Sequence, residues 1–274
     1  MNNKKLLRRM VAASMAIGTL TFTPTFDDNG LQMTISIAQA KIQTYPGFGE
    51  GYANEYENQE VAKQRALLKA IQSAKDKAGI YLMSYSKSIN ARLVEDDIIA
   101  ITSNTAKIVG EVKYQKVIRP ISDQTTIILW QATVNVNIDD EEVTKWLKRD
   151  AKEKLNIITQ AKELQKNDIE NDKEITDLRK KAQNVKTQQE KENLKKEFIR
   201  LDNEFIANRK LEEGNELYYK KDYQSAIKSY DEALKLKPDF DWAYNNRSVC
   251  YQKIGENEKA KADFQKAKQL GYKN

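Results

Sequence analysis

Residues 214–272 read GNELYYKKDYQSAIKSYDEALKLKPDFDWAYNNRSVCYQKIGENEKAKADFQKAKQLGY, and this stretch contains an internal repeat. Six pairs of residues lie 34 positions apart, and most of them match in size or aromatic character: Gly214 and Ser248, Tyr223 and Asn257, Ala226 and Ala260, Tyr230 and Phe264, Ala233 and Ala267, Pro238 and Tyr272. A period of about 34 residues is typical of stacked helix-turn-helix units. The sequence therefore predicts two such units in the C-terminal region.

The pattern resembles the tetratricopeptide repeat (TPR) family, whose helix-turn-helix units bind other proteins. The resemblance implies one repeat over residues 207–240 and a second over 241–274. Small residues are expected where the two helices of a repeat cross closely, and Pro238 is expected to stop the second helix of the first repeat. The small packing positions are Gly214, Ala226 and Ala233 in the first repeat and Ser248, Ala260 and Ala267 in the second.

In the TPR family the inner face formed by the first helices binds peptides. The resemblance places six candidate partner-binding residues on this face: Asn215, Tyr218, Tyr219, Trp242, Asn246 and Lys253. Asn215 and Asn246 match two asparagines of the carboxylate clamp found in chaperone cochaperones. The sequence departs from that clamp because Leu211 stands where its first lysine belongs and a third repeat is missing. Capture of a C-terminal carboxylate needs converging cations, and only Lys253 and Arg247 lie nearby.

Two repeats are fewer than the three that a stable stack usually needs. We therefore expect a helix from about Glu190 to Asn208 to pack against the first repeat in place of a third unit. The second repeat has no capping helix after it in the sequence. It is expected to leave apolar surface open to a partner or to a second copy of the chain.

Residues 141–206 are predicted to form a highly charged helical connector. Its apolar residues follow three stripes with helical spacing, and the phase slips near residues 167–173 and again near 186–190. A single coiled coil would keep its phase. The pattern therefore favours two or three helices folded back as a hairpin. The alternative is one long helix that pairs with a second copy as a coiled coil.

Residues 41–140 are predicted to form a small α+β domain, an antiparallel sheet with packed helices. Thr125 to Ile138 alternates apolar and polar residues, which is typical of a half-buried strand. An alanine-rich helix is expected from Ala62 to Ala78, because its small residues recur every four positions. The glycine-rich stretch from Tyr45 to Gly51 is expected to be a turn. Further elements are expected as strands at Ser88–Val94 and Lys107–Ile118 and as a short helix at Asp96–Ala106.

This region resembles a bacterial envelope family that includes a small surface lipoprotein and the N-terminal domain of a flagellar assembly protein. The resemblance rests on the alanine-rich helix, on Tyr81 to Ser86, on Asp96-Asp97-Ile98 and on the long final strand. It covers about a hundred residues. It implies a structural role outside the cytoplasm and no known chemistry.

The first forty residues have the pattern of a secretory signal peptide. Lys4, Lys5, Arg8 and Arg9 form a basic start, Val11 to Phe22 is a short apolar core, and Ala38-Gln39-Ala40 precedes Lys41 as a small-x-small cleavage motif. The pattern predicts residues 1–40 as a leader, with Ala38, Ala40 and Lys41 at the cleavage site. The alternatives are an uncleaved anchor, which would be the protein's one membrane contact, or a wrongly assigned start codon.

The composition argues against several classes of function. The net charge of +6 results from 46 basic and 40 acidic residues that are mostly interspersed, without the clustered basic face of a nucleic-acid binder. The chain has no histidine, which removes the commonest general base and metal ligand. Cys250 is the one cysteine, so no disulfide within the chain is expected. No catalytic residue, metal site or cofactor is predicted.

These observations together predict an exported, non-enzymatic adaptor of a bacterial periplasm or cell envelope that binds a protein or peptide through its repeat groove. The main alternative is a structural scaffold that forms a homo-oligomer through the connector and the last repeat. Two weaker alternatives remain: an enzyme that uses Glu95, Asp96 and Asp97, and nucleic-acid binding through the basic residues of the connector.

Overall fold

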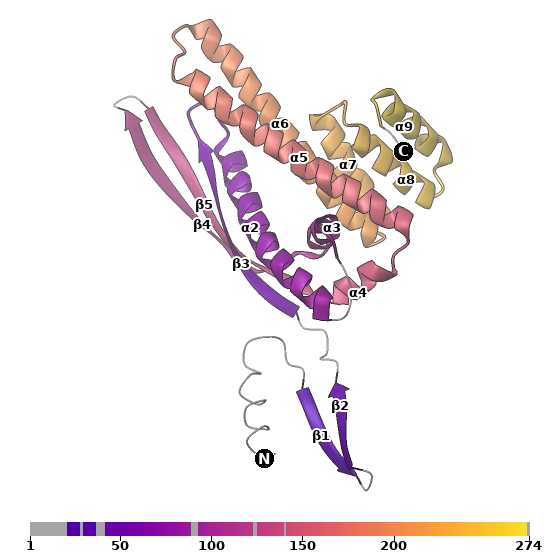
Figure 1. The fold of residues 1–274 in the computed structure, drawn as a ribbon. Helices are drawn as coiled ribbons and strands as arrows, with labels where there is room; N and C mark the ends of the chain where they lie inside the picture. Colours follow the sequence, from indigo (N-terminus) through magenta and orange to yellow (C-terminus); the bar gives the residue numbers. More distant parts are fainter. Residues whose placement is uncertain are drawn as a thin grey trace.

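The computed structural model describes residues 21–27, 30–36, 42–88, 93–122, 125–139 and 141–272. These residues form a three-stranded antiparallel sheet with helices on one side of it, followed by six further helices (Figure 1). The predicted fold class is confirmed: a small antiparallel sheet comes first in the chain and a helical repeat region comes last. None of the helices in the described part of the chain combines the length and the apolar character that crossing a lipid bilayer requires.

A separate hairpin precedes the sheet. Strands β1 (Thr21–Asp27) and β2 (Gly30–Ser36) pair antiparallel and lie away from the remaining elements in Figure 1. Both strands fall inside the predicted leader. Most of the expected apolar core lies outside the described residues, as do the cleavage residues Ala38, Ala40 and Lys41. The signal peptide therefore stays a prediction.

The sheet has the order β3-β5-β4, with β3 at Ile42–Ala53, β5 at Thr125–Asp139 and β4 at Lys107–Ser122. The central strand β5 was expected from its alternation, and Ala132, Val134, Val136 and Ile138 are indeed buried on one face. That face is covered by the long helix α2 (Gln59–Ser88), as Figure 1 shows. Gly79 does not break α2, which continues without interruption to Ser88.

The prediction of a turn at Tyr45–Gly51 was wrong, because these residues lie within strand β3. Gly47, Gly49 and Gly51 alternate along one face of the strand and are buried against α2. A methyl group at any of the three would overlap a backbone carbonyl of α2, at Ala70, Ala66 and Ala62 respectively. Glycine here serves close backbone approach rather than chain reversal.

The strand expected at Ser88–Val94 is not found at either of its described ends. Ser88 is the last residue of α2, and Leu93 and Val94 form the irregular lead into helix α3 (Glu95–Thr105), while residues 89–92 lie outside the described part. The first turn of α3 is capped by Asp97, whose carboxylate accepts a hydrogen bond from the Val94 amide at 3.0 Å. Helix α3 itself and strand β4 are close to their predicted bounds.

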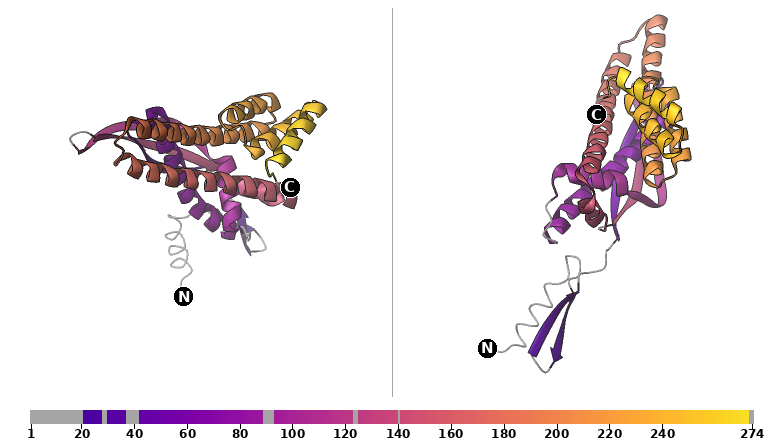
Figure 2. Two further views of the ribbon diagram at one scale, coloured as in Figure 1. Left: turned by 90° about the horizontal axis from the view of Figure 1, so that it is seen from above. Right: turned by 90° about the vertical axis from the view of Figure 1, so that its right-hand side faces the viewer.

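The connector is a hairpin of two helices within one chain. After the short helix α4 (Glu141–Lys148), helices α5 (Ala151–Ala182) and α6 (Gln188–Tyr219) run antiparallel, and the two views in Figure 2 show the pair along one side of the molecule. Near the turn they bury a cluster of large apolar side chains: Ile175, Leu178, Leu194, Phe198 and Leu201. The predicted phase slip near residues 167–173 does not exist, because the buried side of α5 continues through the polar residue Asn171.

Asn171 connects the hairpin to the sheet unit. Its side chain donates to the carbonyl of Leu201 at 2.9 Å and accepts a hydrogen bond from Arg65 of α2 at 3.2 Å. Arg65 also pairs with Asp202 of α6 at 2.8 Å, and both partners of this ion pair are almost fully buried. Burial raises the pKa of Asp202 in spite of the adjacent guanidinium. Polar contacts thus fix the middle of the hairpin onto α2.

The boundary predicted between residues 206 and 207 lies inside α6. The second half of α6 serves as the first helix of the first repeat and is followed by α7 (Tyr223–Leu236), α8 (Asp241–Lys253) and α9 (Asn257–Gln269). The segment expected to replace a missing third repeat is therefore part of the repeat helix itself. The helix that packs against the first repeat is α5, which contributes Leu164 to the core of the repeats.

The last repeat does not expose the apolar surface that its position suggested. None of the large apolar side chains between residues 200 and 272 is exposed. The outward positions of α9 are mainly lysine and glutamine, and its alanines Ala260 and Ala267 face α8 and are buried. A helix with small residues inside and long polar residues outside presents a polar face to solvent.

Candidate protein-binding site

The two repeats have matching turns between their helices. In the first repeat Lys221 adopts a φ of 63°, and 34 positions later Gly255 adopts a φ of 83°. The next residue donates in each case to a carbonyl five residues before it, from Asp222 to Leu217 at 3.0 Å and from Glu256 to Tyr251 at 2.9 Å. The same backbone turn thus recurs with the sequence period.

The expected packing residues lie where the helices of each repeat cross. A methyl group on Gly214 would overlap the ring of Tyr230, which is buried between α6 and α7. The other small residues, Ala226, Ala233, Ser248, Ala260 and Ala267, are all at most 1 % exposed. Helix α7 ends at Leu236, so Pro238 follows the helix it was expected to stop.

Arg247 holds the three last helices together. From α8 it donates two hydrogen bonds to Asp263 of α9, both at 2.7 Å, and a further one to Asp231 of α7. These partners raise the pKa of the guanidinium although its burial alone would lower it. Because both carboxylates are engaged by it, Arg247 is a structural cation. It is not available to bind an anionic peptide end.

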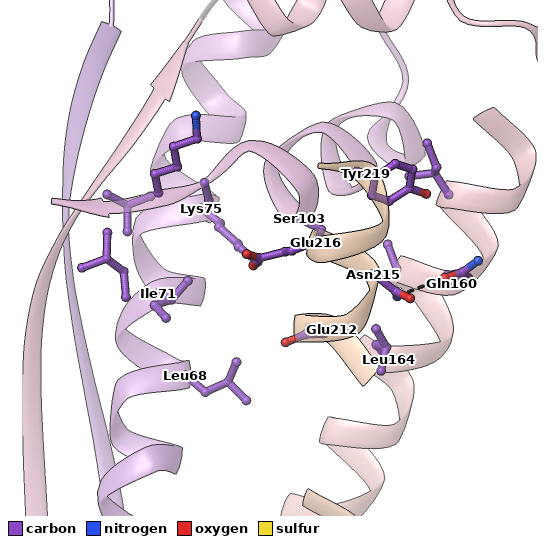
Figure 3. Close-up of a pocket in the computed structure, with 16 residues that line it drawn as sticks. Leu68, Ile71, Lys75, Ser103, Gln160, Leu164, Glu212, Asn215, Glu216 and Tyr219 are labelled. Carbon is purple, nitrogen blue, oxygen red and sulfur yellow. Dashed lines mark hydrogen bonds between the residues drawn. The ribbon is translucent and has the colours of Figure 1, made fainter. Parts of the chain in front are cut away.

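The two asparagines of the inner face are brought together by a residue that the sequence analysis did not identify. Gln160 of α5 places its side-chain oxygen 3.0 Å from the Asn215 amide nitrogen and 3.1 Å from that of Asn246 (the contact to Asn215 is drawn in Figure 3). The Asn246 amide also donates to the oxygen of Asn215 at 2.8 Å, and that oxygen accepts from the Tyr230 hydroxyl at 2.9 Å. The inner face is therefore occupied by α5 of the same chain.

Further contacts of α5 and α6 surround this amide set. Leu164 lies one turn beyond Gln160 and is buried in the repeat core. Asp168 lies another turn further and accepts two hydrogen bonds from Arg209 of α6, at 2.6 and 2.7 Å. Tyr219, at the end of α6, packs against the core of the sheet unit, and burial raises its pKa to about 12. The contacts run along one side of α5 at helical spacing.

The remaining predicted partner-binding residues are not gathered on one open surface. Tyr218 packs against the rings of Tyr219 and Tyr223, with centroids 5.5 and 5.7 Å away. Trp242 is half-buried against Tyr272, at 5.0 Å between ring centroids. Lys253, the last residue of α8, is exposed. Polar Gln160 interrupts the apolar stripe of α5, and that interruption is the one signal in the sequence that could have revealed its role.

A cavity of about 380 Å³ lies beside α5, between the repeats and the sheet unit (Figure 3). Apolar side chains such as Leu68 and Ile71 of α2 form one wall, and Lys75 and Glu216 extend into the space from α2 and α6. Burial lowers the pKa of Lys75, an effect that the nearby Glu212 opposes. Ala161 of α5 lines this cavity and also a second, more open groove of about 880 Å³. The two hollows show that the side of α5 facing α2 is loosely packed.

The acidic residues considered for chemistry have structural partners. Asp96 pairs with Lys162 of α5 at 3.0 Å, and Asp97 accepts a hydrogen bond from the indole of Trp146 at 2.9 Å in addition to capping α3. Asp139 accepts from the backbone amide of Glu141 at 2.9 Å, at the start of α4. In the described residues, no three side chains of the metal-binding types gather at one point. These contacts give Asp96, Asp97 and Asp139 structural roles.

Comparison with known families identifies the C-terminal helices. A family profile described as "TPR repeat" matches residues 214–255, and one described as "Tetratricopeptide repeat" matches residues 243–270. The C-terminal region carries two tetratricopeptide repeats. The matches begin inside α6 and end one residue after α9, so they span the helices that form the inner face and its backing layer.

Similar curated proteins match over the same region. The sperm-associated antigen 1 of Rattus norvegicus is 46% identical over 63 residues, which are 23% of this chain and 7% of that protein. The Hsp70-Hsp90 organizing protein 1 of Glycine max is 38% identical over 65 residues, 24% of this chain and 11% of that protein. The STIP1 homolog of Dictyostelium discoideum is 40% identical over 58 residues, 21% and 10% of the two chains. This chain thus spans only a small part of these relatives.

Proposed function

We propose that this chain is a non-enzymatic adaptor that binds a protein partner through its two TPR repeats. The observation that supports it most directly is the repeat pair itself, with an inner face whose two asparagines form a continuous set of side-chain amides. A relative with a matching region is named as an organizer of Hsp70 and Hsp90. Two of the three acidic residues that an enzymatic alternative would require are engaged, Asp97 in a helix cap and Asp96 in an ion pair.

We further propose that the adaptor acts in a bacterial envelope. The support is the basic-apolar-small pattern of residues 1–40 and the resemblance of residues 41–140 to an envelope family. In this arrangement the sheet unit docks to an envelope component and the repeats bind the partner. Cell fractionation tests the location. Recovery of the protein in the cytoplasm at full length would contradict export, and recovery of a chain that starts at Lys41 would support it.

The homo-oligomer remains the alternative function, and two observations make it the weaker one. Five large apolar residues of the connector pack together between α5 and α6 of the same chain, although Leu147, Leu155, Ile169 and Ile199 are exposed, and α7 to α9 expose no large apolar side chain. We expect the protein to sediment as a monomer at all accessible concentrations. A dimer that dissociates on dilution would favour the structural scaffold.

The adaptor function is tested by crosslinking in the native envelope followed by affinity capture. Three proteins are compared: the unaltered chain, the Asn215→Ala/Asn246→Ala variant, and a Lys261→Ala/Gln265→Ala variant whose changes lie on the exposed side of α9. A partner lost in the first variant and kept in the second supports binding through the inner face. A partner kept by all three moves the binding site to another surface. Recovery of the chain alone contradicts the adaptor.

A further inference from the structure

We propose that the inner face of the repeats is a groove for an amphipathic helix of a partner protein that carries a side-chain amide between two aliphatic residues. Helix α5 occupies this groove in the free protein, and the partner helix displaces the first half of α5. The proposal rests on the adaptor function proposed above. It identifies the chemistry of the partner and the event that accompanies binding.

The amide specificity follows from the polar groups of the groove. Asn215 and Asn246 both direct amide N–H groups at one point, where the Gln160 oxygen accepts them. Two arginines of the repeat region are engaged elsewhere: Arg247 by Asp231 and Asp263, and Arg209 by Asp168 and Glu212. A neutral acceptor therefore fits the site better than a charged one, because neither arginine is free to compensate a buried carboxylate.

The helical specificity follows from the spacing of the contacts along α5. Ile157, Gln160 and Leu164 are all buried and lie three and four residues apart, so they share one side of a helix. Ile157 packs toward the sheet unit beside Tyr219, and Leu164 enters the repeat core. A helix laid in a groove through residues at such intervals is a common mode of peptide recognition. A partner would reproduce the pattern of aliphatic residue, amide and aliphatic residue.

Two features make the first half of α5 exchangeable. On the side facing α2, Ala161 borders both the cavity of about 380 Å³ and the groove of about 880 Å³, and the ion pair of Lys162 with Asp96 of α3 is about half exposed, so it contributes little. The second half is anchored separately, because Ile175 and Leu178 pack against Phe198 and Leu201 near the hairpin turn. The second half keeps these contacts when the first half leaves the groove.

The test uses a labelled synthetic peptide of residues 150–170, which copies the first half of α5 with its capping residue Asp150. Its binding to the purified full-length chain is measured by fluorescence anisotropy. The unaltered chain is expected to bind it weakly, since its own α5 competes at the effective concentration of an attached helix. The Gln160→Ala chain loses two hydrogen bonds to the groove and should bind the peptide about tenfold more tightly.

Three controls make the result specific. Adding Asn246→Ala to Gln160→Ala should abolish the gain, and the exposed substitution Gln165→Ala should not produce it. A peptide in which Gln160 is replaced by Leu should bind the Gln160→Ala chain about tenfold more weakly than the original peptide. Thermal unfolding of every variant shows whether the fold is retained, and Asn215→Ala replaces Asn246→Ala if the latter unfolds.

Several outcomes would overturn the proposal. Absence of peptide binding to folded Gln160→Ala protein would show that α5 is a fixed part of the repeat stack. Equal binding to all chains would place the peptide on another surface, and a Gln160→Ala dimer in light scattering would assign the groove to a second copy. Because only purified components are used, peptide exchange without any captured envelope partner would contradict the adaptor function alone. A captured partner without peptide exchange would contradict only the helix groove.

Discussion

Gln160 of α5 accepts a hydrogen bond from Asn246 of α8 at 3.1 Å, across 86 positions of the sequence. This contact joins the connector to the second repeat. Asn215 of the first repeat donates a further hydrogen bond to the same Gln160 oxygen. The residues that resemble a peptide-binding pair therefore already have a partner within the chain. Any account of how this protein binds others has to include the release or the retention of α5.

The contribution of this amide set to stability can be measured with a double-mutant cycle. Asn246→Ala leaves the oxygens of Gln160 and Asn215 short of a donor in a buried site, and we expect it to lower the free energy of unfolding by about 1–3 kcal/mol. Gln160→Ala should cost about 1 kcal/mol, and the double variant should cost less than the sum by about 1 kcal/mol. Urea titrations provide the values. Strict additivity would show that the two side chains do not interact in solution.

The contact between β3 and α2 yields a second prediction. Gly49→Ala should lower the free energy of unfolding by about 3 kcal/mol, because the added methyl group overlaps the backbone of α2 and a backbone cannot rotate away. Denaturant titration followed by circular dichroism measures the change. The neighbouring Phe48 points to the opposite face and is 50% exposed, so Phe48→Ala is the matched control and should cost far less. Similar losses for both variants would mean that α2 does not lie this close to the strand.

The same strand shows which part of the fold the sequence predicts. The alternation of β5 and the small residues of α2 indicate a strand and a helix directly, because burial on one face selects residues at the element's own period. Glycines at 47, 49 and 51 have the same period of two but no side chain to reveal it. By local propensity they favour a turn, and only the proximity of Ala66 and Ala70 explains them.

The sequence likewise predicts one part of the candidate site and not another. The 34-residue period predicts the inner face of the repeats, since the packing residues Gly214 and Tyr230 recur with it. The occupant of that face was not predicted, because Gln160 and Asn171 are polar and resemble gaps in an apolar stripe. Each is buried because it has a specific partner from a distant part of the chain. Long-range hydrogen bonds of this kind leave no periodic signal in one sequence.

The ion pair between Arg65 and Asp202 provides a third prediction. Both side chains are less than a tenth exposed, so Asp202→Ala leaves an unpaired guanidinium in the interior and should cost about 3–5 kcal/mol. Arg200 of α6 and Glu174 of α5 form a comparable pair, but each is about half exposed. Glu174→Ala should therefore cost no more than about 1 kcal/mol. Denaturant titrations compare the two, and equal losses would contradict the burial of the first pair.

The matching turns of the repeats allow a prediction in which one substitution stabilises. Lys221 has the positive φ that Gly255 has in the second repeat, and a side chain in this conformation costs about 1 kcal/mol. Lys221→Gly should raise the free energy of unfolding by up to that amount, and Gly255→Lys should lower it by a similar amount. Lys220→Gly, one residue earlier at a negative φ, is the control and should destabilise. A loss of stability in Lys221→Gly would mean that the first turn has another conformation.

Cys250 is predicted to be inert in the folded protein. Its side chain is 0 % exposed in the repeat core, and burial raises the pKa of the thiol to about 12. Only the thiolate reacts with iodoacetamide, so at pH 9 the buried thiol stays protonated, whereas in the unfolded chain about three quarters of the thiols are ionised. Alkylation followed by mass spectrometry should show negligible labelling in buffer and complete labelling in denaturant. Raising the pH from 7 to 9 should accelerate labelling of the unfolded chain and leave the folded protein unlabelled. Rapid labelling in buffer at pH 9 would show that the helices around Cys250 open readily, and the packing of α6 to α9 would then need revision.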